Sequence, residues 1–332
     1  MKSAIKSAIN SVSSGGAQAP PTFLSKVKVP SLFLLWYMLN VYYNIVNKKV
    51  LNVVPAPITI SAVQLLIGSI YWSLTVLVGL KPKPKLPCPV HRDGLNIGAA
   101  AFSHSCGQTL TVVSLGAGAV SFTHIVKALE PFFSAMVSIF FTKKVMHPNV
   151  YLSLIPVVGG VGLACLKELS YSHVAFFAAL GSNLFFAVRA VKSKQVMQSE
   201  KLDATITPSN LFGIQTCLAT VVGLLFALTM EGFKAVSIVS SSDNSRLLMR
   251  AIFLSGLFHY LNNEVMYMTL GQVDAVTLAV GNTMKRVFII VASVIVFGNQ
   301  VSTESAIGSA VGIGGVLLYS LTKMKYEKLE KK

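Results

Sequence analysis

The stretch DAVTLAVGNTMKRVFIIVASVIVFGN, residues 274–299, is apolar over most of its length and carries Lys285 and Arg286 near its middle. As a helix it is long enough to cross about 30 Å of hydrocarbon. An unbroken apolar run from Val287 to Val291 follows the two charges, so both side chains cannot reach the membrane surface by snorkelling. On insertion scales the pair costs about 6 kcal/mol unless it faces a cavity or a partner. We therefore interpret the two cations as functional, with internal ion pairing as the structural alternative.

Hydrophobic stretches of this length recur along the whole chain of 332 residues, of which 53% are hydrophobic and 12% charged. That balance leaves too little polar surface for a soluble globule. The sequence therefore predicts an all-α integral membrane protein with ten transmembrane helices. The expected spans are 30–53, 56–80, 94–116, 119–142, 148–166, 172–195, 209–230, 248–271, 274–299 and 303–323.

The formal net charge of +16 follows the loops between these spans and forms no pattern typical of a nucleic-acid-binding protein. If the N-terminus is cytosolic, the segments on that side hold 18 Lys and Arg and the opposite side holds six. The positive-inside rule then places both termini in the cytosol, which requires an even number of spans. We expect a basic tail over 1–29, a solvated proline-rich linker over 81–93 and a charged tail over 326–332.

Two short motifs recur at nearly the same spacing. "GGV" stands at Gly159–Val161 and at Gly314–Val316, 155 residues apart, and "AVSF" from Ala119 is echoed by "AVTL" from Ala275, 156 residues on. Because a repeat of five helices is odd-numbered, its second copy enters the membrane from the other side. We therefore predict two inverted five-helix repeats with a substrate site between them near the midplane. The predicted repeats span 30–166 and 167–325.

Two further cations lie inside predicted spans. Lys127 occupies the fourth span, the repeat partner of the ninth, and pairing with Glu130 on the same helix face is its structural alternative. Arg189 lies near the end of the sixth span, where snorkelling to the surface is an open alternative. The spans offer few acids, chiefly Glu130 and Glu264, so positive charge is left over. An anionic substrate would balance it, and Arg and Lys suit phosphate oxygens.

The spans lack the motifs of catalysis and metal binding. They contain no HExxH and no paired carboxylates, and three of the four cysteines lie inside spans without metal-ligand spacing. We therefore expect no catalytic residue, no metal and no cofactor. Glycines in the two GGV-containing spans are expected to let helices pack closely and to have no other role. They are Gly159, Gly160, Gly162, Gly308 and Gly312.

Four segments resemble the plastid phosphate translocators, the sugar-phosphate/phosphate antiporters of the drug/metabolite transporter superfamily. They are "WYMLNVYYNIVNKK" from Trp36, "VSFTHIVKALEPFFS" from Val120, "SNLFFAVRAVKSK" from Ser182 and "VGNTMKRVFIIVAS" from Val280. The resemblance covers nearly all ten spans and implies the drug/metabolite transporter fold. It also implies exchange of inorganic phosphate for phosphorylated three-, five- or six-carbon compounds.

The resemblance implies a substrate site as well. The residues that would hold the phosphate group are Thr111, Lys127, Lys285 and Arg286, and Arg189 would reach the rest of the substrate. Two further candidate substrate-binding positions depart from the family pattern. Gln108 stands where triose-phosphate and glucose-6-phosphate carriers typically have His, and Asn262 stands where the family typically has Tyr. The amide at position 108 is nearer to the phosphoenolpyruvate carriers.

We therefore expect an alternating-access antiporter that exchanges inorganic phosphate for triose phosphate, 3-phosphoglycerate or phosphoenolpyruvate across a plastid membrane. Its partners would be these metabolites and the lipid bilayer, with no nucleic acid, and it would act as a monomer. A nucleotide-sugar transporter of the secretory pathway is the alternative within transport, and a membrane enzyme acting on phosphorylated lipids is the alternative outside it. The absence of a full-length transit peptide fits a trimmed chain or a carrier in the outermost membrane of a complex plastid.

Overall fold

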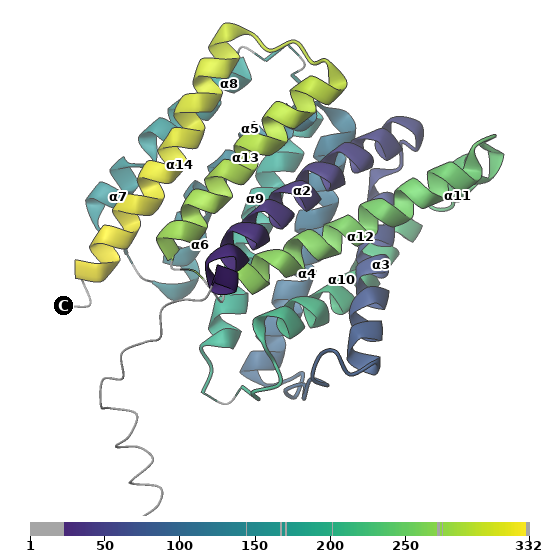
Figure 1. Cartoon of the computed structure of the whole chain (residues 1–332), viewed down its shortest axis with the longest axis horizontal. Coiled ribbons are helices and arrows are strands. Elements are labelled where there is room, and N and C mark those ends of the chain that lie inside the picture. The colour runs from purple at the N-terminus through teal and green to yellow at the C-terminus, as the bar shows by residue number, and fades with distance from the viewer. Residues whose placement is uncertain are drawn as a thin grey trace, which may run out of the picture.

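The computed structural model describes residues 23–143, 145–166, 168–169, 171–200, 202–270, 273 and 275–329. Every regular element within these ranges is a helix (Figure 1). The elements are α2 (Phe23–Val53), α3 (Pro57–Leu77), α4 (Arg92–Ala117), α5 (Val120–Val126), the short 3₁₀ helix η1 (Lys127–Leu129), α6 (Glu130–Thr142), α7 (Pro148–Leu152), α8 (Ile155–Leu166), α9 (His173–Met197), α10 (Pro208–Met230), α11 (Lys234–Ser241), α12 (Ser245–Leu270), α13 (Ala275–Phe297) and α14 (Thr303–Leu329). The predicted tail over 1–29 lies outside the described residues as far as position 22.

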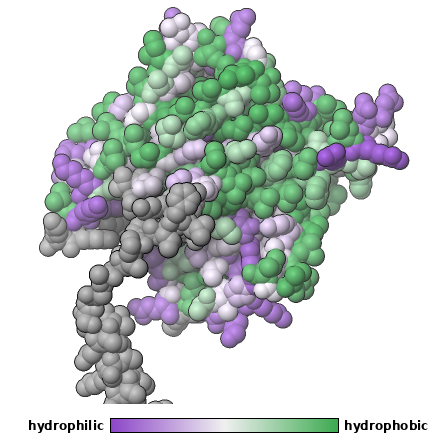
Figure 2. All heavy atoms as spheres, in the orientation of Figure 1, coloured by the Kyte–Doolittle hydropathy of each residue, from purple (hydrophilic) through white to green (hydrophobic). Residues whose placement is uncertain are grey.

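Eight helical segments in the described part of the chain are long and apolar enough to cross a bilayer. Their outer surface is apolar too, because large side chains such as Phe140 and Ile295 are about three-quarters exposed. Figure 2 shows hydrophobic residues covering the middle of the visible face and hydrophilic residues gathered toward its ends. Such a surface is stable in lipid and not in water. The prediction of an all-helical protein with several membrane spans is confirmed.

Two more helices, α4 and α12, match the length of these segments but fall outside that group of eight. The reason for α4 is its inner face, where polar side chains lie fully buried among the neighbouring helices. They include Ser103, His104, Ser105, Gln108, Thr109, Thr111 and Ser114. Polar residues at membrane depth are costly unless they face the inside of a bundle, where they mark functional positions. The polarity of α4 therefore points to the centre of the molecule.

Helices distant in sequence lie side by side in the bundle. α4 packs against α9 and α10, and α2 packs against α12 and α13 (Figure 1). α3 lies between α10 and α12, while α8 pairs with α14 at the far side. This arrangement brings α4, α9, α13 and the α5–α6 segment around one interior region.

The pairing of α8 with α14 depends on glycine. A Cβ on Gly160 would lie 2.3 Å from the backbone nitrogen of Gly312, and one on Gly308 would lie 2.5 Å from the backbone nitrogen of Ala164. The two backbones are therefore in direct contact, as small residues allow in membranes. The prediction of close packing is confirmed for these glycines and wrong for Gly159 and Gly162, which face open space.

Charged side chains join neighbouring segments at each end of the bundle. At one end the Glu231 carboxylate accepts hydrogen bonds from the N–H groups of Ile58 and Thr59, 3.0 and 2.8 Å away, at the start of α3. A carboxylate is favourable there because the first N–H groups of a helix lack partners within the helix. At the same end Lys48 donates hydrogen bonds to the carbonyls of Leu115 and Gly118, which lie at the C-terminal end of α4.

The opposite end contains an ion pair between Lys81 and Glu264, both largely buried. Glu264 also accepts a hydrogen bond from Ser209 Oγ at 3.1 Å. The prediction that the linker 81–93 is solvated throughout is therefore wrong at its first residue. Lys81 turns inward because Glu264, which is buried in α12, needs a cation to compensate its charge.

Candidate substrate site

The α5–α6 segment breaks at the residue that the sequence singles out, Lys127. Pro131 has no N–H, and its ring would clash with the Lys127 carbonyl in a regular helix. The chain therefore tightens into η1, where the Glu130 N–H donates to the Lys127 carbonyl. This leaves the Val126 carbonyl without its helical donor, and Asn183 Nδ2 on α9 donates to it at 3.0 Å. The break thus holds Lys127 in a defined place facing α9.

Lys127 binds hydroxyls from two other helices. Its Nζ donates to Thr111 Oγ1 at 3.1 Å and to Ser182 Oγ at 2.8 Å, and these two oxygens are 2.7 Å apart. The ammonium also lies 4.7 Å from the centre of the Phe186 ring. An ammonium beside two hydroxyls is a set of groups that binds anionic oxygens. The structure brings together the predicted site residues Lys127 and Thr111.

The two cations of α13 point in different directions. Lys285 Nζ lies 4.5 Å from the centre of the fully buried Trp36 ring on α2. Arg286 Nη2 donates to Glu130 Oε2 at 2.5 Å, which joins α13 to α6. The structural alternatives were internal ion pairing for the α13 cations and pairing of Lys127 with Glu130, and their outcomes differ. Lys127 does not form the expected bond with Glu130, whereas Arg286 does have an internal partner.

The charges around Lys127 do not balance. Among the described residues, those in electrostatic range of its ammonium are Glu130, Arg189, Lys285 and Arg286. Four cations thus share one carboxylate, and Glu130 keeps about half of its side chain exposed. Unpaired charge away from water is costly, so this cluster favours a bound anion.

Arg189 also faces the interior. Its Nη1 donates to His104 Nδ1 at 2.8 Å, and its guanidinium lies 5.1 Å from the centre of the Phe186 ring, the ring that Lys127 contacts. The snorkelling alternative for Arg189 is therefore wrong. His104 in turn stacks on His259 of α12, with ring centres 6.2 Å apart.

Both histidines are buried and have a ring nitrogen to offer. The Nε2 atoms of His104 and His259 have no hydrogen-bond partner among the described residues. Since Arg189 can only donate, His104 Nδ1 must accept, and its proton must lie on Nε2. Buried N–H groups without partners are rare in folded proteins. The Nε2–H group of His104 therefore has a hydrogen bond still to donate.

Gln108 belongs to a neighbouring network of buried amides. Its Nε2 donates to the Tyr43 hydroxyl at 2.9 Å and to Gln64 Oε1 at 3.1 Å. Gln64 Nε2 then donates to Asn47 Oδ1 at 2.8 Å and to Ser255 Oγ at 3.2 Å. Gln108 therefore lies in a wall that joins α2, α3, α4 and α12, one helical turn from Thr111.

Asn262 is the predicted site residue whose contacts are purely local. Its Nδ2 donates to the carbonyls of Phe258 and His259 in its own helix, at 2.8 and 2.9 Å. His259 of the same helix does join the interior region, and its ring lies 5.3 Å from the Tyr43 ring, centre to centre.

Sequence reasoning missed several residues of this region. They are Ser182, His104, His259, Tyr43 and Gln64. Single Ser, His or Tyr residues inside a span carry little signal, because each is common in helix packing. The best available signal was the concentration of polar residues in α4, which includes His104. The described residues contain no group of three or more His, Cys, Asp or Glu that could hold a metal ion.

The fold and this cluster define an integral membrane protein whose helices bring four cations together around one carboxylate. The sequence pattern of the Triose-phosphate Transporter family matches residues 27–320. The chain belongs to this family of transporters. It is a carrier and not an enzyme, and the resemblance seen in the sequence is confirmed.

Individual relatives agree with this assignment. The chain is 37% identical over 322 residues to the chloroplastic triose phosphate/phosphate translocator of Flaveria trinervia, covering 95% of this chain and 77% of that protein. It is 38% identical over 305 residues to the translocator of the same name from Zea mays, covering 90% and 72%. It is also 37% identical over 314 residues to the chloroplastic phosphoenolpyruvate/phosphate translocator 1 of Oryza sativa subsp. japonica, covering 93% and 75%. A solved crystal structure with 14% identity and a TM-score of 0.59, covering 89% of this chain and 98% of that one, has the same fold.

Proposed function

We propose that the protein exchanges inorganic phosphate for phosphorylated three-carbon compounds, namely triose phosphate, 3-phosphoglycerate or phosphoenolpyruvate. The observation that carries the proposal is the cluster of four cations around one carboxylate inside the bundle. A phosphate group supplies the missing negative charge and several acceptor oxygens. The relatives named as triose phosphate/phosphate and phosphoenolpyruvate/phosphate translocators support the same choice.

Each candidate residue has a proposed role that follows from its contacts. Lys127 and Thr111 hold the phosphate together with Lys285 and Arg286, which approach from α13. Arg189 binds the carbon part of the substrate, such as a carboxylate, together with the histidine pair beside it. Gln108 and Asn262 lie on the walls of the site and shape it, without contacting phosphate. Action as a monomer is part of the same proposal.

Obligatory exchange follows from the charge of the site. Closing the empty centre away from water would bury unpaired cations, and this desolvation is expensive. A bound phosphate dianion neutralises part of the charge and lowers the cost of closing. The carrier therefore changes its open side readily only when loaded, so that one anion leaves for each that arrives.

The proposed architecture is ten spans in two inverted repeats, 30–166 and 167–325. The ten spans are the eight apolar segments together with α4 and α12. Support comes from the contacts when α2, α3, α4, α5–α6 and α7–α8 are matched in order with α9, α10, α12, α13 and α14. The pair α4–α9 then corresponds to α12–α2, α4–α10 corresponds to α12–α3, and α6–α9 corresponds to α13–α2. The pairs α3–α10, α5–α13 and α8–α14 correspond to themselves. A two-fold relation between halves explains all six observations.

The proposed location is a plastid envelope membrane, with both termini in the cytosol. The chloroplastic relatives support the organelle, and the excess of basic residues on one side of the spans supports the orientation.

The test is transport by the purified full-length chain in liposomes. Uptake of labelled phosphate is compared between vesicles preloaded with phosphate and empty vesicles, with competition by dihydroxyacetone phosphate, phosphoenolpyruvate, glucose 6-phosphate and a nucleotide sugar. We expect uptake only into preloaded vesicles, with three-carbon phosphates competing, and loss of exchange in Lys285→Ala and Arg286→Ala. Equal uptake into empty vesicles, or competition by the nucleotide sugar alone, would refute the proposed function.

A further inference from the structure

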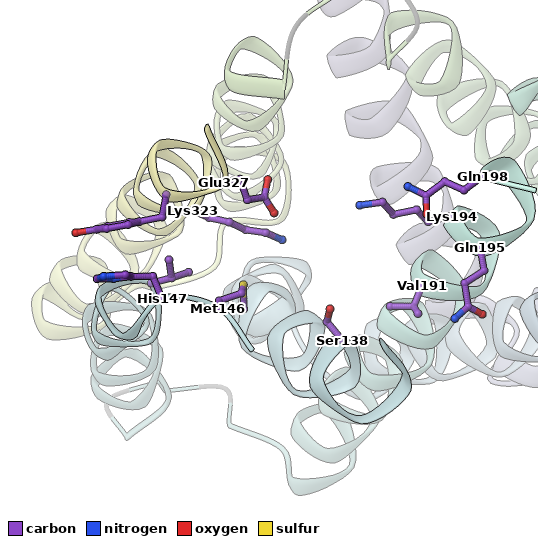
Figure 3. Close-up of a pocket in the computed structure, with 11 residues that line it drawn as sticks. Ser138, Met146, His147, Val191, Lys194, Gln195, Gln198, Lys323 and Glu327 are labelled. Atoms are coloured by element: carbon purple, nitrogen blue, oxygen red, sulfur yellow. The ribbon is translucent and has the colours of Figure 1, made fainter. Parts of the chain in front are cut away.

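A polar cavity lies away from the central cluster, at the end of the bundle where α6, α9 and α14 finish and α7 begins (Figure 3). Its volume is about 360 Å³, within the range of small-molecule sites. Lys194 and His147 on its rim are exposed, so the cavity opens to water. It is large enough for a small metabolite and accessible to one.

The charged side chains of this cavity come from opposite sides. Lys194 reaches into it from α9, while Lys323 and Glu327, one turn apart on α14, reach into it from the other side (Figure 3). The His147 ring stacks on Tyr326. The charged lining residues from α9 and α14 are two lysines and one glutamate, and charged concave surfaces concentrate ions of opposite sign.

One face of α6 extends from this cavity toward the central site. Ser138 lines the cavity, and Ser134 and Glu130 follow at intervals of four residues on the same face of α6. Eight residues of α-helix separate Glu130 from Ser138, a distance of about 12 Å. Glu130 is bonded to Arg286, so this face of α6 ends at the cation cluster.

We propose that this cavity, bounded by Lys194, Lys323 and Glu327, is a docking site where the phosphate group of a free metabolite binds before it reaches the central site. This proposal rests on the proposed function, because it assumes that phosphorylated compounds are the cargo. The two lysines attract and bind the anion. The Glu327 carboxylate repels it and so speeds its release toward the central site. A docking site of this kind raises the apparent affinity for external substrate without changing the rate of the transporting step.

The test measures exchange of labelled inorganic phosphate at low ionic strength by the double variant Lys194→Gln/Lys323→Gln in liposomes of neutral phosphatidylcholine. The matched control is Lys325→Gln/Lys328→Gln, which removes the same charge from exposed positions on α14. We expect the cavity variant to raise the apparent KM for phosphate by about three- to tenfold relative to the control, at an unchanged maximal rate. Glu327→Gln should lower it by about threefold, and both differences should shrink as salt is added.

The outcomes separate the two proposals. If the wild-type protein exchanges phosphate but the cavity variant and the control have the same KM, the docking site is refuted while the proposed function stands. If the wild-type protein does not exchange phosphate, the proposed function itself fails. A phosphate group on a lipid could occupy the same cavity, so the measurement is repeated with anionic phospholipid added. A difference that appears only in anionic vesicles would assign the cavity to a lipid headgroup and refute docking of the free metabolite.

Discussion

Replacing Lys127 by methionine removes the ammonium at the centre of the site and keeps a side chain of similar length against Phe186. In the structure Lys127 Nζ lies 3.1 Å from Thr111 Oγ1 and 2.8 Å from Ser182 Oγ, so a phosphate oxygen beside these hydroxyls would lie within hydrogen-bonding distance of it. Removing one partner of a buried, hydrogen-bonded charge pair costs about 2–5 kcal/mol. A loss near 3 kcal/mol corresponds to a roughly 100- to 200-fold weaker affinity for phosphate.

Two measurements check this value. Trans-stimulated uptake of labelled phosphate by Lys127→Met in liposomes should require a roughly 100-fold higher substrate concentration than uptake by the wild-type protein or by Lys325→Met, a control at an exposed position. Thermal unfolding in detergent should show a Tm at or above the wild-type value without substrate, because a desolvated charge has been removed. Added phosphate should raise the Tm of the wild-type protein and not that of Lys127→Met.

The two readouts distinguish a binding role from a structural one. A Lys127→Met protein with a wild-type phosphate affinity, within threefold, would refute contact between Lys127 and the anion. A variant that has lost several degrees of Tm without substrate would show that Lys127 stabilises the fold through Thr111 and Ser182, which contradicts our interpretation.

Three further predictions address the substrate's carbon part, the packing and the buried ion pair. Arg189→Gln should weaken competition by 3-phosphoglycerate by about tenfold or more and leave phosphate homoexchange within threefold; equal losses for both would contradict a role toward the carbon part. Gly160→Ala should destabilise the protein by about 1–3 kcal/mol in thermal unfolding because its Cβ meets backbone, whereas Gly159→Ala should be neutral, and equal shifts would contradict the packing. Glu264→Gln should cost about 3–5 kcal/mol by leaving a buried lysine unpaired, whereas Asp203→Asn at an exposed pair should leave the Tm close to the wild-type value, and a stable Glu264→Gln protein would overturn this account.

The helical membrane architecture could be predicted from sequence because an apolar run of about 20 residues has few stable structures other than a membrane-spanning helix. The expected spans 94–116 and 248–271 coincide with α4 and α12. As membrane spans these two remain a prediction, because they fall outside the eight apolar segments. Helix ends also shifted. α2 begins at Phe23, before the expected start at 30, because Pro30 is accommodated within the helix.

The central cations could be found in the sequence for a related reason. A charge inside an apolar run is costly unless it faces a cavity or a partner, so its presence there is informative. Their partners could not be found in this way. The bond between Arg286 and Glu130 joins residues 156 positions apart, and its existence depends on how α13 lies against α6. The same holds for Ser182, whose hydroxyl meets Lys127 only because Pro131 breaks the helix at η1 and turns that lysine toward α9.

The valence of the exchanged anions, and not the fixed charge of the centre, determines how exchange responds to membrane voltage. The formal charge of the centre, summed over Lys127, Arg189, Lys285, Arg286 and Glu130, is 4 − 1 = 3 positive charges, and it cancels because it is common to both halves of the exchange cycle. Each elementary charge that crosses a potential of 100 mV gains or loses about 2.3 kcal/mol. A dianion traded for another dianion moves no net charge, so such exchange is independent of voltage in both directions. A trivalent anion traded for a dianion must either give up one proton or move one net charge through the field, with or against it according to the direction of exchange. The membrane potential would then sort substrates by valence, even where the site binds their carbon skeletons equally well.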